Sequence, residues 1–441
     1  MSSIPYVCAA LVTVLTTVAN SAARSTGFIR RQRQLTGASF VQALVFAALA
    51  KPATSVEQFA QAAGAAGTPI TAQGFDQRFT PQAAACLRQV LGAAAKQLVA
   101  ADPVAIPLLQ RFSGVFVLDS TTIMLPDALA DEWQGNGGST SVGTSAAVKV
   151  QVLWNLTTGS LQHLSLHAGR ANDNASSAQE VVLPAGALRI ADLGYFAVAR
   201  IARLLTQQVF VLSRLNTQAA LFDPHGQRLD LLTLLSQAGP TLDQPLLLGA
   251  KEQLEVRLLA VRVPQEVADQ RRRRLRKEWG DKGKTPSARL LALAAWTTVV
   301  TTVPVELLSV AEALVLLRAR WQIELLFKLW KSHGRVDEWR SAQPWRILCE
   351  VYAKLLAMIV QHWVLLVGCW HQPNRSLVKA AQTVQGYALA LLSALGKSSE
   401  RVVEILEEIH RCLRKTARLN SRKKKPSTYQ LLLATPTGAL T

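Results

Sequence analysis

The stretch GVFVLDSTTIML at residues 114–125 marks the change from helical to strand-like periodicity along the chain. Its alternating, β-branched residues predict a strand. Two more strands are expected at 146–156 and 161–169, joined as a hairpin by the short turn TTGS. The elements expected next are a helical stretch at 175–183, a buried strand at 188–194, a helix at 196–207 and a strand at 208–215. This order predicts an α/β fold with a sheet covered on its faces.

Two aspartates stand where expected strands end. Asp119 follows VFVL, and Asp192 follows LRIA just before Gly194. Such sheets present functional side chains at strand ends, so two aspartates on neighbouring strands can bind one cation. In the alternative interpretation each aspartate only caps a turn or the following helix.

A third acid, Glu324, lies in LRARWQIELLFKLWKSH at 317–333. At about 100° per residue, one stripe of this expected helix carries Leu317, Arg320, Glu324, Lys328 and Lys331. The opposite surface, with Trp321, Leu325 and Leu326 toward its edges, is expected to supply apolar packing.

The stripe has two interpretations. Pairing of Glu324 with Lys328 one turn on would stabilise a surface helix by only about 0.2 to 0.5 kcal/mol. Alternatively, Glu324 is a third metal-binding carboxylate, since Mg²⁺ prefers oxygen ligands and a two-metal phosphodiester site needs several carboxylates. Arg320 and Lys331 would then hold substrate phosphates.

Composition favours a polyanionic partner. The 441 residues are 49% hydrophobic, enough for sizeable cores, and carry a formal net charge of +19. Nucleic acid is the expected partner, with a membrane surface as the main competitor. The five cysteines form no CxxC pair, which argues against a zinc site and fits a reducing cytosol. The apolar run at 6–19 is too short to span a bilayer, and we expect it to be a packed helix.

Residues 1–108 are expected to form helices that bind DNA. Helices are predicted at 39–50, 55–67 and within 70–98, and the first two of these followed by the segment TAQGFDQRF are compatible with a helix-turn-helix. The preceding basic patch FIRRQRQ includes Arg30 and Arg31, which we predict to contact DNA. The alternative is a small helical bundle with solvated basic residues.

A β-rich insertion is expected at about 216–308, with strands in 245–263 and 296–307. Between them lies the linker-like, highly basic RRRRLRKEWGDKGKTPS at 271–287, for which phosphate contact is favoured over simple solvation. Residues 341–441 are expected to be helical and to end in the basic tail RKTARLNSRKKKPS at 414–427. Its helices are candidates for a dimer interface.

These motifs together resemble the DDE transposases of the insertion sequence four family. The resemblance rests on LDST around Asp119, ADLGYF around Asp192 and the spacing of Arg320, Glu324 and Lys331, and it covers nearly the whole chain. Additional similar stretches are GFIRRQRQLTGASF, GRANDN at 169–174 and YAKLLAMIVQHW at 352–363. The family signature begins with a tyrosine, and this sequence has Leu317 at that position.

The resemblance implies a ribonuclease H-like catalytic core at 109–340 containing the insertion, an N-terminal DNA-binding region at 1–108 and a C-terminal helical region at 341–441. It implies that Asp119, Asp192 and Glu324 hold two Mg²⁺ or Mn²⁺ ions. Arg320 and Lys331 would position phosphate, and Lys149 is a further candidate for that role. Trp296, at the matching separation from Glu324, would stack on a flipped base.

The implied function is metal-dependent cleavage at transposon ends followed by strand transfer into target DNA. The implied partners are the terminal inverted repeats, the target DNA and a second copy of the chain, in the cytoplasm of a bacterium at the nucleoid. Two alternatives remain from the sequence: an inactive DNA-binding protein of the same fold, and a metal-dependent endonuclease without strand transfer.

Overall fold

The structure is a computed structural model that describes residues 4–31, 34–136, 145–372, 374–420 and 426–434. The chain forms two compact units. Unit 1 comprises residues 1–106, 118–181 and 322–429, and unit 2 comprises residues 107–117, 182–321 and 430–441. Unit 1 therefore contains parts of all three segments expected from the sequence, and the three-segment division stays a prediction.

Unit 1 begins with a helical layer. Its N-terminal elements are α1 Ile4–Val12, the π-helical turn η1 Thr13–Val18, α2 Ala19–Ser25, α3 Gly37–Ala50, α4 Val56–Ala65, α5 Ala72–Asp76 and α6 Pro81–Lys96. Capping boxes begin α3 at Thr36 and α4 at Ser55, where Gln58 supplies the reciprocal side chain. The segment proposed as a helix-turn-helix consists of α3, α4 and the five-residue α5, and its DNA-binding role stays a prediction.

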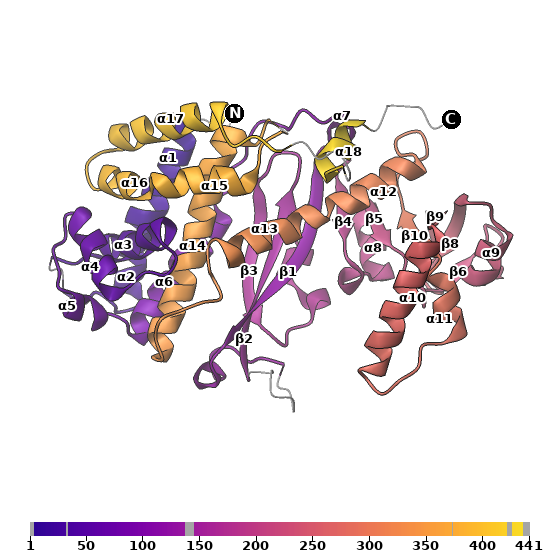
Figure 1. Cartoon of the computed structure of the whole chain (residues 1–441), viewed down its shortest axis with the longest axis horizontal. Coiled ribbons are helices and arrows are strands. Elements are labelled where there is room, and N and C mark those ends of the chain that lie inside the picture. The colour runs from indigo at the N-terminus through magenta and orange to yellow at the C-terminus, as the bar shows by residue number, and fades with distance from the viewer. Residues whose placement is uncertain (1–3, 32–33, 137–144, 373, 421–425, 435–441) are drawn as a thin grey trace. The chain divides into compact units, whose positions relative to one another are not determined.

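The C-terminal helices complete this layer. They are α14 Pro344–Cys369, α15 Leu377–Gly386, α16 Ala388–Leu395, α17 Ser399–Lys415 and α18 Thr428–Ala434, which lies across the unit boundary. α14 packs against α3, α6 and α17, and Figure 1 shows it among them. The helical C-terminal region is thus confirmed, while residues 421–425 of the basic tail lie outside the described part of the chain.

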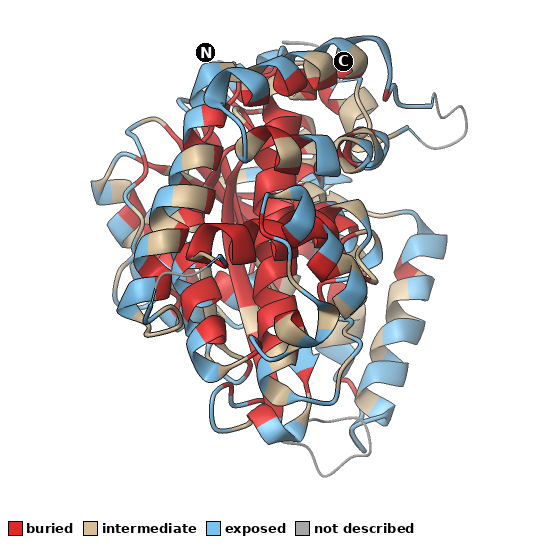
Figure 2. Ribbon diagram, turned by 90° about the vertical axis from the view of Figure 1, so that its left-hand side faces the viewer, coloured by how far each residue is buried: buried red, intermediate tan, exposed pale blue. Residues whose placement is uncertain are grey.

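Two helices of unit 1 are long and apolar enough to cross a membrane, judged by length and composition alone. The first spans Ile4–Ser25, so the expectation that this segment is too short was wrong: the helix continues through Ser25. The second is α14, and 94% of its apolar window is buried inside the protein. Figure 2 shows buried residues gathered in the interior and exposed residues on the outer turns of the surface helices. α14 is thus the core helix that its sequence predicts.

The sheet of unit 1 has the order β3-β2-β1. β1 is Val115–Leu125, of which the residues from Leu118 onward belong to this unit, β2 is Ala146–Asn155 and β3 is Leu161–Ala168. β2 and β3 pair antiparallel, with Lys149 opposite His167 and Gln151 opposite Ser165, which confirms the predicted hairpin.

The prediction of a helix at 175–183 was wrong. The chain forms short 3₁₀ turns there, Asp173–Ala175 and Ser177–Gln179, started by side-chain caps from Asn172 and Ser176.

Unit 2 continues the strand order from the first residues of β1 as β1-β4-β5-β10-β9-β8-β6-β7. Its strands are β4 Leu188–Ala191, β5 Phe210–Arg214, β6 Leu221–Phe222, β7 Arg228–Leu229, β8 Thr241–Leu248, β9 Leu254–Arg262 and β10 Trp296–Thr301. β4 and β5 are parallel, as expected for strands joined by a helix, here α8 Val198–Thr206. β10 pairs antiparallel with β5, so the strands of the expected insertion extend the same sheet.

The remaining helices of unit 2 are α7 Pro107–Gln110, α9 Leu231–Gln237, α10 Gln265–Gly280, α11 Ala288–Leu293 and α12 Val310–Ala319. The linker expected at 271–287 was therefore wrong over its first ten residues, which belong to α10. The expected helix at 317–333 exists as the end of α12 and as α13 Trp321–Ser332, which meet at Arg320. A mixed α/β fold with a large sheet and surrounding helices is confirmed.

Candidate active site

Asp119 lies within β1, not at its end as the sequence suggested. The first four residues of the strand are buried, and the four residues from Asp119 onward are half-buried. The backbone N–H of Ser120 donates to Oδ1 of Asp119 over 2.8 Å. β1 continues to Leu125 because TTIML keeps the β-branched, apolar character of a strand. The carboxylate of Asp119 therefore projects from the interior of a regular strand and not from a turn.

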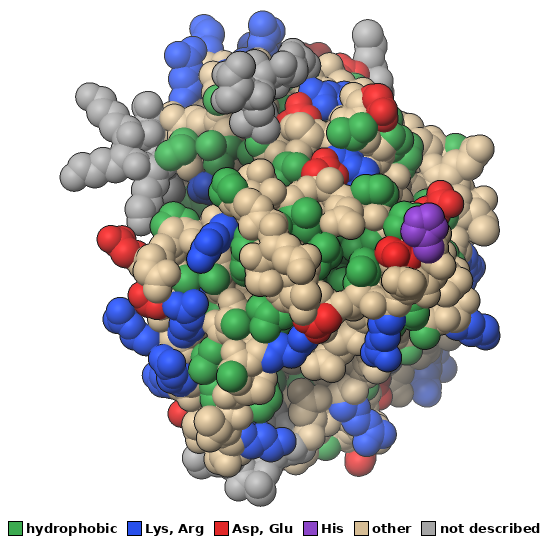
Figure 3. Space-filling view, turned by 90° about the vertical axis from the view of Figure 1, so that its right-hand side faces the viewer, with side chains coloured by type: hydrophobic (Ala, Val, Ile, Leu, Met, Phe, Trp, Pro, Cys, Tyr) green, Lys and Arg blue, Asp and Glu red, His purple; other side chains and the backbone are tan. Residues whose placement is uncertain are grey.

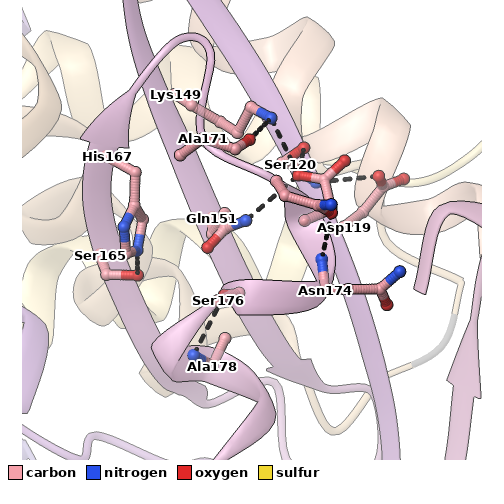
Figure 4. Close-up of polar contacts among 12 residues, drawn as sticks. Asp119, Ser120, Lys149, Gln151, Ser165, His167, Ala171, Asn174, Ser176 and Ala178 are labelled. Carbon is pink, nitrogen blue, oxygen red and sulfur yellow. Dashed lines mark hydrogen bonds and ion pairs between the residues drawn. The ribbon is translucent and has the colours of Figure 1, made fainter. Parts of the chain in front are cut away.

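Beside Asp119, unit 1 holds a polar cluster around Asp173 (Figure 4). Oδ1 of Asp173 accepts from the Ser120 hydroxyl at 3.3 Å, from Nζ of Lys149 at 3.1 Å and from Nε2 of Gln151 at 3.2 Å. Lys149 also donates to the Ala171 carbonyl at 2.6 Å, and its side chain is only 13% exposed. Lys149, predicted to contact DNA, therefore has a carboxylate partner in this structure.

The histidines of β3 border this cluster. Nε2 of His167 lies 2.8 Å from the Ser165 hydroxyl, and Nε2 of His163 lies 3.1 Å from the Ser177 hydroxyl. Burial lowers the pKa of both histidines. The pKa of His163 is lowered further by the neighbouring His167. The pKa of His167 is lowered further by the positive charge of Lys149, whereas the negative charge of Asp173 raises it. Both rings are therefore neutral at pH 7.

The sequence analysis did not identify Asp173 as a functional candidate. The residue lies in GRANDN, a stretch that carried part of the family resemblance, but a single aspartate in a polar loop has no periodicity to single it out. Its contact with Ser120, the neighbour of Asp119, is what distinguishes it here.

Helix α13 brings Glu324 and Lys331 to the same unit. Nζ of Lys331 donates to the carbonyl of Thr122 in β1 over 2.8 Å, three residues after Asp119. Glu324 and Lys331 are both half-buried, at the border of the helix face buried through Ile323, Leu326, Phe327, Leu329 and Trp330. The prediction that Trp321 and Leu325 pack was wrong, because their side chains are 53% and 44% exposed.

Unit 2 brings together Asp192 and Arg320. Asp192 directly follows β4, as predicted, and Nη2 of Arg320 lies 3.9 Å from its Oδ1. Asp192 occupies the capping position of the next 3₁₀ turn, but its side chain accepts no capping hydrogen bond there. The capping alternative therefore does not account for this residue. Leu317, in the tyrosine position of the family signature, is buried in α12.

Trp296 begins β10 and is half-buried. The guanidinium of Arg262, its partner in the β9–β10 register, lies 6.0 Å from the centre of the indole ring. One edge of the strand is held by Arg271 of α10, whose Nη1 donates to the Trp296 carbonyl at 3.0 Å.

Arg30 and Arg31 follow α2 and are exposed. Their DNA contacts stay predictions.

The predicted metal ligands are divided between the units: Asp119 and Glu324 belong to unit 1, and Asp192 belongs to unit 2. In the part of the chain that the structure describes, no three His, Cys, Asp or Glu side chains form a group that could hold a metal ion. Their assignment as a common metal site therefore stays a prediction. The three side chains offer only carboxylate oxygens, the donor type that Mg²⁺ and Mn²⁺ prefer.

Comparison with known proteins decides the family. Residues 110–360, more than half of the chain, match the family model described as the transposase DDE domain. The chain belongs to the DDE transposase family. The family model includes Asp119, Asp192 and Glu324, and the prediction of a transposase of the insertion sequence four type is confirmed.

Relatives extend the similarity of this DDE transposase beyond that domain. It is 24% identical to the transposase for insertion sequence element IS231D of Bacillus thuringiensis subsp. finitimus, over 93% of this chain and 91% of that protein. It is 24% identical to the transposase for insertion sequence element IS1151 of Clostridium perfringens over 58% of each chain. A segment of 101 residues is 36% identical to the putative transposase for element IS186A of Escherichia coli, covering 23% of this chain and 27% of that protein. DNA transposition is therefore its function.

Proposed function

We propose that this DDE transposase cuts DNA at the ends of its own element and joins the freed 3′-hydroxyl to target DNA. In this proposal Asp119, Asp192 and Glu324 hold two divalent ions, Mg²⁺ or Mn²⁺. The observation that supports the proposal is that Arg320 lies 3.9 Å from Asp192 in unit 2, while Lys331 in unit 1 contacts Thr122 of β1, the strand that carries Asp119.

A ribonuclease H-like core is supported by the strand order. Unit 1 has β3-β2-β1, with β2 and β3 antiparallel, and unit 2 continues with β1-β4-β5, with β4 and β5 parallel. A hairpin followed by parallel strands connected through a helix is the arrangement that we expected from the resemblance. The β-rich insertion corresponds to the strands from β6 to β10.

The spacing within unit 1 supports the pairing of Asp119 with Glu324. Lys331 contacts Thr122, and Glu324 precedes Lys331 by seven residues, or about 10 Å along a helix. Asp119 precedes Thr122 by three residues, also about 10 Å along a strand. These similar offsets from one contact support the proposal that the two carboxylates act together.

The basic residues are proposed to bind phosphate. Arg320 and Lys331 share the helical stripe with Glu324, and a guanidinium beside carboxylates suits bidentate contact with a phosphodiester. Lys149 would reach phosphate only by leaving Asp173. Trp296 has one ring face near Arg262, an arrangement that suits stacking on an extruded base. Arg30 and Arg31 are proposed to contact the DNA backbone from the N-terminal helices.

The chemistry proposed for the chain is phosphoryl transfer without a covalent protein intermediate. Bound divalent ions would supply Lewis acidity for activating water and for stabilising the leaving oxygen. The carboxylates hold those ions, and Arg320 and Lys331 offset phosphate charge and orient the scissile bond. The same site then accepts the 3′-hydroxyl as the attacking group.

Strand transfer joins two ends, so we propose that two copies of the chain act together on DNA, with the C-terminal helices as the contact region. Action on chromosomal DNA places the enzyme in the bacterial cytoplasm at the nucleoid. Sedimentation with end DNA tests the first proposal, and a complex with one copy of the chain per end pair contradicts it.

The test of activity uses purified protein, MgCl₂ and a duplex carrying the sequence that flanks the coding region. Joined products are expected from the wild type. Cuts without joining would indicate an endonuclease, and DNA retention without cuts would indicate a binding protein. We expect Asp119→Ala, Asp192→Ala and Glu324→Ala each to abolish cleavage with DNA binding retained.

Glu306→Ala is the matched control, since Glu306 is an exposed acid in the turn between β10 and α12. It should cleave like the wild type. Unchanged cleavage by any one of the three alanine variants would remove that residue from the proposed site.

A further inference from the structure

The basic run RRRRLRK at 271–277 is divided by its helix into two sets of side chains. α10 has one packed face, on which Ala268 is buried and Arg271, Arg272, Leu275 and Trp279 are half-buried. Arg271 donates to the Trp296 carbonyl and to the Thr297 hydroxyl, each at 3.0 Å. Arg272 donates to the Leu291 carbonyl at 3.1 Å and to Asp269 at 2.7 Å. These two arginines fix the helix to β10 and α11.

The other set points outward. Arg273, Arg276 and Lys277 are exposed, and at about 100° per residue they lie about 140°, 80° and 180° around the helix from Ala268. The exposed Lys282 and Lys284 follow in the turn around Gly283, whose φ is +66°. Within the described residues, Arg273, Arg276 and Lys277 have no ion-pair partner, whereas Arg274 pairs with Glu278 at 3.5 Å.

The nearby acids do not cancel this outward charge. Glu278 is engaged by Arg274, and Asp269 by Arg272. Glu266 and Asp281 are exposed near the two ends of the helix. Figure 3 shows Lys and Arg side chains grouped along the left edge of the face that it displays. A group of exposed cations without an ion-pair partner among the described residues therefore remains on a helix whose other face is held by β10 and α11.

We propose that this outward face of α10, formed by Arg273, Arg276, Lys277, Lys282 and Lys284, binds the phosphate backbone of duplex DNA without regard to sequence. A membrane surface would require an apolar face beside the cations, but the face opposite them is packed against β10 and α11. Five exposed cations within twelve residues suit the closely spaced phosphates of a polyanion, and duplex DNA is the polyanion on which this enzyme acts.

The contacts of α10 also connect this surface to the strand that carries Trp296. Arg271 joins α10 to the carbonyl of Trp296, and Arg262 lies over the Trp296 ring. Backbone binding on the outer face would therefore hold the duplex beside the strand that carries Trp296. The inference rests on the proposed action on DNA, but it does not depend on which carboxylates hold metal.

The experiment measures equilibrium binding of the full chain to two 30-base-pair duplexes at several salt concentrations, with Ca²⁺ replacing Mg²⁺. One duplex has random sequence, and the other carries the sequence flanking the coding region. The test variant is Arg273→Gln/Arg276→Gln/Lys277→Gln. Loss of three phosphate contacts should reduce the slope of log affinity against log salt by about 2.7.

Two controls keep the result specific. Lys51→Gln/Lys251→Gln/Lys397→Gln removes the same charge from exposed sites elsewhere and should leave the slope nearly unchanged. Arg273→Lys/Arg276→Lys keeps the charges and should bind like the wild type. Circular dichroism should match for all variants, because every substituted side chain is exposed.

Equal loss on both duplexes is expected and supports phosphate binding by α10 without regard to sequence. Loss on the flanking sequence alone would overturn the proposal, because it would make the contact specific for end DNA. An unchanged slope in the test variant, or an equal drop in the scattered control, also overturns the proposal. If the wild type binds neither duplex, the proposed function itself fails, so the two failures are distinguishable.

Discussion

The buried imidazole of His362 predicts a measurable loss of stability in mild acid. His362 lies in α14, is 2% exposed, and its Nε2 is 2.6 Å from the carbonyl of Gly159 in the β2–β3 turn. Because a carbonyl only accepts, Nε2 must carry the proton of the neutral ring. Burial lowers the pKa of His362 from its ordinary 6.5 to about 4, although the hydrogen bond to Gly159 opposes the shift.

The sign and size follow from linkage. The unfolded chain takes up a proton on this histidine below pH 6.5, whereas the folded chain does so only near pH 4. The contribution of His362 to the free energy of unfolding is therefore fully present above pH 6.5, and it is lost as the pH falls from 6.5 to 4. The difference between the two pKa values corresponds to about 3 kcal/mol.

The assay is urea unfolding at pH 7 and pH 4, followed by tryptophan fluorescence. The rings of Trp154 and Trp370 lie 6.1 and 6.3 Å from the imidazole, so the emission reports on this region. His362→Gln keeps a donor for the Gly159 carbonyl and removes the titration. Between pH 7 and pH 4 the wild type should lose about 3 kcal/mol more than this variant. Equal losses would refute the reasoning.

Two further predictions concern the same unit. Asp173→Asn should lower the free energy of unfolding by about 1 to 2 kcal/mol, because Lys149 is mostly buried and loses its charged partner. In urea unfolding, the double variant Asp173→Asn/Lys149→Met should recover part of this loss. No recovery would contradict the pairing of Asp173 with Lys149. Gly159→Ala should cost about 2 to 4 kcal/mol, since φ is +72° and the new Cβ would lie 2.5 Å from the Trp370 ring. Gly226→Ala, with φ +82° and open space around the Cβ, should cost only about 1 kcal/mol, and equal melting shifts for both variants would argue against the Gly159 contact.

Elements with one strong periodicity were predicted well from the sequence. The β2–β3 hairpin was placed almost to the residue, because period-two alternation on both sides of TTGS leaves one register that buries the apolar face. The same holds for β4, α8 and β5, whose boundaries differ from the prediction by at most three residues. Local pattern and tertiary burial agree at these positions.

Where the prediction failed, side-chain chemistry or the neighbouring surface decided the outcome. Asn172 and Ser176 cap short turns, so 175–183 does not become the α-helix that its composition allowed. α10 forms because Arg, Lys, Glu and Gln are good helix formers, a propensity that the charge-based interpretation of 271–287 overlooked. Trp321 and Leu325 are exposed because a helical stripe fixes which residues share a direction, but not which direction meets the core.

The basic residues beside Glu324 have a structural use that complicates their functional test. Arg320 is directed to Asp192 after β4, and Lys331 donates to Thr122 in β1, so each connects the helical segment to a strand that carries a predicted acid. Removing either side chain would disturb the position of an acid as well as phosphate binding. Loss of cleavage in Lys331→Met therefore cannot by itself assign a phosphate contact. Lys331→Arg keeps the charge but not the compact ammonium at the Thr122 carbonyl, so retained DNA affinity with a lowered cleavage rate would separate positioning from binding.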